Sequence, residues 1–108
     1  MKDNVISIED RLTQEEQALR ARMSAFAQTF PTMGYARGVD PWDAEKLDAW
    51  GRGPRSHGER VTAQFLLGVW DPSATWKCGR FDVIDALRIW DSTHHQAFLR
   101  WAAEPWWP

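Results

Sequence analysis

Capping boxes divide this chain into short helical segments. Thr13 with Glu16 matches the pattern T-x-x-E, in which each side chain satisfies a free backbone N–H group of the first helical turn. Ser56 with Glu59 repeats the pattern, and apolar residues then recur at three- and four-residue steps, the period of an amphipathic helix. No alternating apolar and polar run is longer than 5–8. The sequence therefore predicts an all-α domain of four or five short helices packed around a tryptophan-rich core.

Prolines and poor helix formers set the expected limits of these helices. Pro31 cannot continue the first helix, and Asp40 followed by Pro41 is the expected N-cap of the second. Residues 91–95 have low helix propensity, which leaves open whether 83–103 is one helix or two. The expected segments are 13–30 with Ser7 as an alternative start, 41–50, a central helix at 57–70, a single turn at 72–76, and 83–103.

The length of the chain, 108 residues, suits a single hydrophobic core. The helical domain is expected at 13–104, between an N-terminal arm at 1–12 and an aromatic tail at 105–108. No uncharged run reaches the roughly 20 apolar residues of a transmembrane helix. The first residues lack the apolar segment of a secretion signal, and the single cysteine cannot form an internal disulfide. We therefore expect a cytoplasmic protein without a membrane partner.

Eight tryptophans are an unusual number for a chain of this size. Trp70, Trp90 and Trp101 each lie on the apolar stripe of an expected helix and are expected in the core, because large rings can fill the interior of a small domain. Trp106 and Trp107 lie beyond the last helix. Two interpretations of this pair stay open: the tail folds back as a lid, or its rings anchor a partner protein, since tryptophan is enriched at binding hot spots. A homodimer through a tryptophan face is a further alternative.

Candidate catalytic and metal-binding residues are few. His94 and His95 are adjacent, so on a helix their imidazoles point about 100° apart and do not share a metal ion. Cys78 stands without a protease signature and is expected to be a small structural apolar residue. The aspartates at helix starts are accounted for as N-caps. We therefore expect no enzyme, with no catalytic residue, no metal ion and no cofactor.

A basic loop between the second and third helices is the remaining candidate site. Arg52, Arg55 and Arg60 lie near the start of a helix, where free N–H groups favour anions. Such a cluster can bind phosphate or carboxylate groups through charge and hydrogen bonds. Glu59 lies inside it, however, and the whole chain has a formal charge of -2. A solvated loop and a nucleic-acid site both stay open.

A motif of large apolar and acidic residues covers 65–91. Its members are Phe65, Leu66, Leu67, Trp70, Cys78, Gly79, Phe81, Asp82, Leu87 and Asp91. This motif resembles the F-L-L-x-x-W … C-G-x-F-D … L … D pattern of a family of small uncharacterised proteobacterial proteins encoded on plasmids and integrative elements. The resemblance implies a bacterial, mobile-element setting and no assigned activity. In general character the chain is also similar to anti-CRISPR proteins, which are small, mildly acidic and without catalytic motifs.

These observations lead to two functional hypotheses. The first is a non-enzymatic protein that occupies a surface of a larger bacterial protein or complex, for example as an anti-defence inhibitor from a phage or mobile element. The alternative is a small nucleic-acid-binding regulator that uses the 52–60 loop and the following helix. The expected partner-binding residues are Trp106, Trp107, Arg52, Arg55 and Arg60.

Overall fold

The computed structural model describes the backbone from residue 8 and the side chains from residue 13. Every regular element in that part is helical, so the predicted all-α fold is confirmed. The arm expected at 1–12 lies mostly outside the described residues. The elements are α1 (Ile8–Ala27), the 3-10 helix η1 (Pro31–Gly34), α2 (Ala44–Arg52), α3 (His57–Trp70), α4 (Val83–Ile89) and α5 (Ser92–Ala103).

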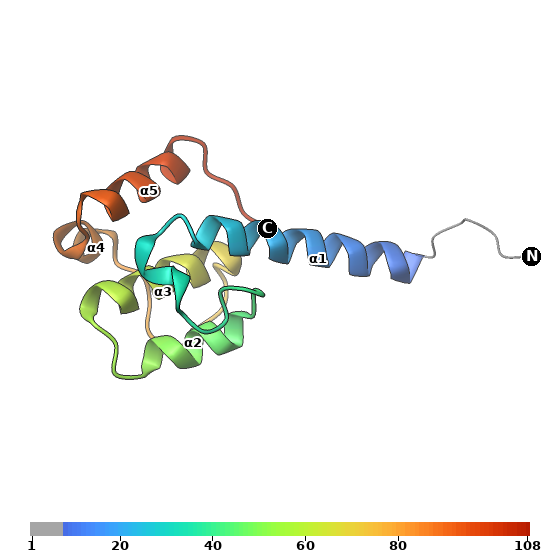
Figure 1. Ribbon diagram of the computed structural model, residues 1–108, viewed down its shortest axis with the longest axis horizontal. Helices are drawn as coiled ribbons and strands as arrows, with labels where there is room; N and C mark the ends of the chain where they lie inside the picture. The colour runs from blue at the N-terminus through green and yellow to red at the C-terminus, as the bar shows by residue number, and fades with distance from the viewer. Residues whose placement is uncertain (1–7) are drawn as a thin grey trace, which may run out of the picture.

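The helix α3 is the centre of the domain, as predicted. It packs against η1, α2 and α4, and Figure 1 shows α2 on one side of it with α4 and α5 on another. The N-terminal part of α1 projects away from the other helices (Figure 1). Residues 13–19 are all exposed, and Met23 is the first buried side chain among those described in α1. Only the C-terminal part of α1 therefore contributes to the core.

Buried aromatic rings form the centre of that core. Trp90 is buried, as predicted, and its Nε1–H donates to the Thr62 hydroxyl at 2.8 Å. Trp70 and Trp101 pack against the core but remain partly exposed. The buried Phe65 of α3 contacts aromatic rings from several elements, at centroid distances from 5.1 to 6.1 Å. Its ring partners are Phe26, Phe30, Phe81, Trp90, Phe98 and Trp101.

N-caps place the starts of α3 and α4 where the sequence predicts them, and a further N-cap begins α5 at a break that the sequence left open. The Glu59 N–H donates to the Ser56 hydroxyl at 3.1 Å, and the Ser56 N–H donates to the Glu59 carboxylate at 2.8 Å. Asp82 accepts hydrogen bonds from first-turn N–H groups of α4. Asp91 accepts one from the His94 N–H at 2.9 Å. The region 83–103 therefore forms two helices, since α4 ends at Ile89 and Asp91 caps the start of α5.

The predicted N-cap of α2 is wrong. Asp43, not Asp40, accepts a hydrogen bond from the first turn of α2, donated by the Lys46 N–H at 3.2 Å. The physical reason is a tight turn just before the helix. Gly38 has a φ of +89°, a conformation that favours glycine, and its carbonyl accepts the Asp43 N–H at 2.7 Å. Residues 39–42 lie within this turn, so α2 begins only at Ala44.

Two other boundaries also differ from the prediction. The single turn expected at 72–76 is confined to 71–74, where the Ala74 N–H donates to the Asp71 carbonyl at 3.3 Å, and it does not continue as a helix. Instead, Asp71 accepts hydrogen bonds from the Ser73 N–H at 3.1 Å and the Ser73 hydroxyl at 2.7 Å, and such local bonds compete with helix formation. Gly51 lies inside α2 rather than beyond its end. A Cβ atom there would lie only 3.1 Å from the Cβ of Cys78, so the glycine allows α2 to pack closely.

The helix α1 begins earlier than the capping box at Thr13 predicts. Its first residue is Ile8, next to the alternative start Ser7, which itself lies outside the described residues. Residues 8–12 contain neither glycine nor proline, so the helix continues through them without interruption. At its other end α1 stops at Ala27, before the proline that was expected to end it.

Candidate functional site

The aromatic tail divides its two tryptophans between core and surface. Trp106 packs edge-on against Phe26 of α1 with ring centroids 5.4 Å apart, and the Arg22 guanidinium lies 3.8 Å from the Trp106 ring centroid. The Trp106 carbonyl accepts the Trp101 Nε1–H at 3.1 Å. Trp107 is 54% exposed and meets Trp101 edge-on at 5.4 Å. The tail thus folds back over the core, yet it leaves one indole at the surface.

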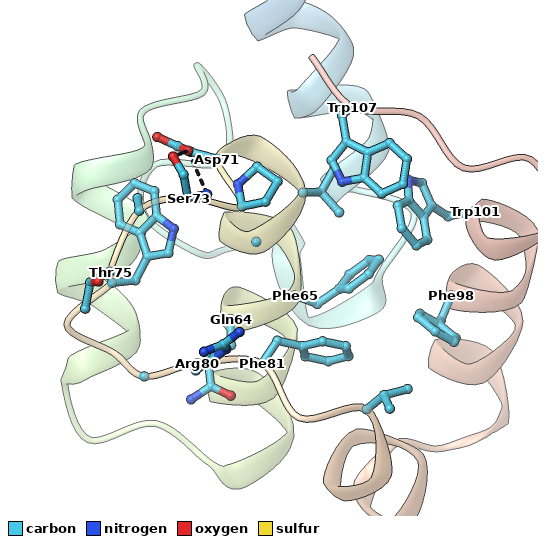
Figure 2. A pocket seen from close by; sticks show the side chains of 17 residues that line it. Gln64, Phe65, Asp71, Ser73, Thr75, Arg80, Phe81, Phe98, Trp101 and Trp107 are labelled. Carbon is cyan, nitrogen blue, oxygen red and sulfur yellow. Dashed lines mark hydrogen bonds between the residues drawn. The ribbon is translucent and has the colours of Figure 1, made fainter.

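Trp107 borders a cleft of about 670 Å³ between α3, the segment that joins α3 to α4, and α5 (Figure 2). Phe65, Phe81 and Phe98 converge in its middle, and Trp101 lies beside Trp107 along one wall (Figure 2). We call this site the aromatic cleft. Its volume and its aromatic lining are those of typical ligand and partner sites, which range from about 300 to 1,000 Å³.

Polar side chains lie along the other rim of the aromatic cleft. Gln64 Nε2 donates to the Cys78 carbonyl at 2.9 Å. Hydrogen bonds from the hydroxyl and N–H of Ser73 hold the pKa of Asp71 below its ordinary value. Arg80 is exposed, and no hydrogen bond or ion pair joins its guanidinium to any described residue. The cleft therefore combines an aromatic interior with an unpaired cation at its edge.

Most of the side chains that line the cleft are apolar or aromatic. The Ser73 hydroxyl donates to the Asp71 carboxylate at 2.7 Å. Among the described residues that line the cleft, none is a histidine, lysine or cysteine. The cleft offers apolar and aromatic surface, with the Arg80 guanidinium and the Asp71 carboxylate at its rim. Tryptophan and arginine are residues that recur in binding hot spots.

An apolar strip on α4 extends the surface of the cleft. The helical period predicts Val83 and Leu87 on the buried side of α4, and this prediction is wrong, because they are 40% and 37% exposed. Ile84 beside them is 65% exposed. The described helix α4 has only 7 residues and buries Ala86 alone, so it presents a small face to α3. Since Val83 also lines the cleft, apolar surface runs from the cleft onto α4.

Two of the three loop arginines hold the loop itself. Arg60 donates through Nε to the Gly51 carbonyl at 3.1 Å and through a terminal nitrogen to the Gly53 carbonyl at 3.0 Å. Arg55 lies 4.4 Å from the ring centroid of Trp50 and donates through Nε to the Trp50 carbonyl at 2.8 Å. The third, Arg52, is exposed. Two of the three arginine side chains expected to contact a partner therefore also stabilise the loop between α2 and α3.

The two predicted patches do not form one site. In Figure 1 the loop between α2 and α3 lies at the lower left, whereas the chain end lies beside α1 on the other side of the domain. Sequence reasoning also missed Arg80, Phe81 and Phe98 as cleft residues. Arg80 and Phe81 stand in an irregular segment, where no periodicity marks a direction. The C-G-x-F-D motif, which includes Phe81, was the sequence feature that could have identified this segment as part of a site.

The two adjacent histidines bond to different elements. His94 is buried, with Nδ1 2.8 Å from a carboxylate oxygen of Asp91 and Nε2 3.1 Å from the Thr32 hydroxyl. His95 Nε2 lies 2.8 Å from the Leu87 carbonyl. Both imidazoles thus join helices and loops together. Within the part of the chain that the structure describes, no three histidine, cysteine, aspartate or glutamate residues gather as metal ligands.

Cys78 is buried beside Asp48 of α2. The Asp48 carboxylate accepts the Cys78 N–H at 2.8 Å and the Lys77 N–H at 3.1 Å. Burial first, and then the hydrogen bond and negative charge of Asp48, raise the pKa of the Cys78 thiol from 9.0 to about 12. A thiol in this setting stays protonated near neutral pH, and the thiolate is the reactive form.

We expect the native protein to react slowly with an aromatic disulfide reagent at pH 8, and to react rapidly once it is unfolded in guanidinium chloride. The raised pKa also stabilises the fold fully below pH 9.0, and this contribution is lost as the pH rises from 9.0 towards 12. Absorbance of the released thiolate measures the first effect, and chemical unfolding at several pH values measures the second. Equal thiol reactivity in the native and unfolded protein would contradict the buried position.

Comparison with known proteins gives no family, no curated relative and no solved structure that matches this chain. Among the described helices, none has both the length and the apolar composition that crossing a bilayer requires.

Proposed function

We propose that this protein is a non-enzymatic binding protein that occupies a surface of a larger bacterial protein or complex. The observation that supports this function is the aromatic cleft with the exposed Trp107 on its wall. Large apolar side chains at a surface are costly unless a partner covers them, and contiguous patches of them are typical of interaction sites. Tryptophan and arginine are also the residues most enriched among binding hot spots.

The cleft favours one kind of occupant. Its interior is aromatic, and the strip of Val83, Ile84 and Leu87 on α4 continues the apolar surface beyond it. Arg80 supplies an unpaired positive charge at the edge. We infer that a segment of the partner protein inserts a large apolar side chain into the cleft and places an acidic side chain against Arg80. In this arrangement the tail contributes Trp107, whereas Trp106 remains packed on Phe26.

The partner class rests on sequence character rather than on geometry. The chain is small, mildly acidic and similar in motif to proteins of mobile elements. A complex of a bacterial defence system is therefore the first class to test, and an anti-defence inhibitor is the role we propose. The cleft does not favour nucleic acid, because its rim carries the negative charge of Asp71 as well as the positive charge of Arg80.

The test is capture of a partner from a bacterial lysate, with nuclease-treated and untreated samples in parallel. We expect a stoichiometric protein that survives nuclease. With the purified partner, Trp107→Ala should weaken binding by about 30-fold, the effect of a typical hot-spot truncation, and Arg80→Glu should weaken it further. Leu99→Ala is the matched control, because Leu99 is an exposed apolar residue that does not line the cleft.

Three results would count against the proposal. Binding that Trp107→Ala and Arg80→Glu leave unchanged would remove the cleft as the docking site. Recovery that disappears after nuclease treatment would indicate nucleic acid instead. Sedimentation of the purified protein as a dimer that Trp107→Ala converts to a monomer would indicate a second copy in the cleft.

A further inference from the structure

A second pocket, separate from the aromatic cleft, gathers cations around two aromatic rings. It has a volume of about 390 Å³ and shares no lining residue with the cleft. Its cations come from three different segments, the connection before α2, the helix α2 itself and the loop after it. Its lining residues are Tyr35, Arg37, Lys46, Ala49, Trp50 and Arg55.

Tyr35 supplies an open aromatic face in this pocket. Its side chain is 64% exposed, and its ring meets the buried Trp50 at a centroid distance of 6.3 Å and an interplanar angle of 61°. The Tyr35 hydroxyl donates to the Glu59 carboxylate, which holds the ring in place from α3. An exposed ring that is fixed at both ends can stack on a flat ligand with little loss of conformational freedom.

The charge in the pocket is positive and largely unpaired. Arg37 and Lys46 are exposed, and no ion pair joins either to the described residues. Arg55 uses Nε for the Trp50 carbonyl, which leaves its terminal nitrogens without a hydrogen-bond partner in the described part of the chain. The nearby Glu59 carboxylate already accepts from Ser56 and Tyr35. Three cations therefore face the site against one carboxylate whose oxygens are engaged.

We propose that this pocket binds a nucleotide. A base stacks on Tyr35, and its phosphate is bound by Arg37, Lys46 and Arg55. Cations alone would suit any acidic ligand, but an acidic peptide leaves the exposed ring without a partner, whereas every base has a face that can stack. The free nucleotide and one nucleotide of a single strand share this chemistry. The proposal stands apart from protein docking in the aromatic cleft, because the two sites have no residue in common.

The experiment measures binding of adenosine monophosphate by calorimetry and of a labelled single-stranded oligonucleotide by fluorescence anisotropy. For the strand, neutralisation of one phosphate predicts a slope of about −0.7 in log K against log salt. The double variant Arg37→Glu, Lys46→Glu should lose at least about tenfold in affinity for both ligands at low salt. Tyr35→Ala should lose roughly fivefold to hundredfold in affinity, the range for one stacked base. Tyr35→Phe keeps the ring and loses only the hydroxyl contact with Glu59, so its loss should be clearly smaller than that of Tyr35→Ala.

The controls separate this site from general charge effects and from the cleft. Arg100→Glu makes the same kind of charge change at an exposed position of α5 and should change binding little. Trp107→Ala should leave nucleotide affinity unchanged, because Trp107 lines only the aromatic cleft. Nucleotide binding and protein docking in the cleft can therefore fail independently. Both ligands binding through these residues supports the proposal, and a strand that binds much more tightly than the monophosphate identifies the strand as the source.

Four results would overturn the proposal. These are no binding of either ligand at low salt, an equal loss from Arg100→Glu, displacement of the strand by inorganic phosphate as effectively as by the monophosphate, and binding of a phosphotyrosine peptide in place of the nucleotide. Circular dichroism of each variant shows that the helices have formed before any loss of binding is interpreted.

Discussion

Phe65→Ala is expected to lower the free energy of unfolding by about 3–5 kcal/mol. Phe65 is buried at the centre of the core and contacts rings from α1, α5 and the segment before α4. Truncation removes apolar surface from the interior and leaves a cavity that several separate elements would have to move to fill. Such edge-on and tilted ring pairs also contribute beyond their buried area. The loss should therefore lie at the upper end for a core substitution.

Urea unfolding followed by far-ultraviolet circular dichroism measures this effect. Phe65→Leu is the conservative comparison, because it keeps much of the apolar volume and should cost clearly less than Phe65→Ala. Ile84→Ala truncates a large apolar residue that is exposed on α4 and should change stability by only about 0.5 kcal/mol. A loss below about 1.5 kcal/mol for Phe65→Ala would mean that the rings around Phe65 can collapse onto one another, contrary to the packing described above.

Asp48→Ala is expected to lower the free energy of unfolding by about 2–4 kcal/mol. The buried Asp48 carboxylate accepts the N–H groups of Lys77 and Cys78, and so ties α2 to the segment between α3 and α4. Without it, two backbone donors lose their acceptor, and an unsatisfied buried donor costs more than a hydrogen bond at the surface contributes. The thiol should respond as well, because Asp48 raises the Cys78 pKa and its removal lowers that pKa.

The same unfolding assay, together with thiol reactivity, checks this second prediction. Asp48→Asn keeps one oxygen acceptor and should fall between the native protein and Asp48→Ala. Glu15→Ala removes the same charge from the exposed part of α1 and should have little effect. The two readouts should move together: a variant that is less stable and yet no more reactive at Cys78 would show that Asp48 does not act at this contact.

Local signals predicted the starts of α3 and α4, and marked the possible break before α5, because each depends on residues only a few positions apart. Ser56 with Glu59, and Asp91 with the N–H of His94, form their bonds within a single turn. The start of α2 was missed for a related reason. Asp40 and Asp43 both precede apolar residues, and the choice between them depends on the turn that Gly38 closes. A capping pattern alone does not contain that information.

The candidate site could be predicted only in part. Trp107 was identified from composition and position. The different burial of Trp106 and Trp107 was not predicted, because only the tertiary contacts of Trp106 with Phe26 and Arg22 of α1 distinguish the two adjacent rings. The loop arginines were identified by charge. Their engagement with carbonyl groups of the same loop depends on the chain path, which charge does not describe.

The sequence by itself determined the all-α fold class, the starts of α3 and α4, and the use of large rings in the core, because capping bonds and the helical period act within a few residues. Only the tertiary structure decided which apolar residues stay at the surface. The period of α4 marks Val83 and Leu87 as one face, but whether another element covers that face depends on how short helices pack around α3. The aromatic cleft and the cationic pocket arise in the same way, since each joins side chains from segments that are distant in the chain.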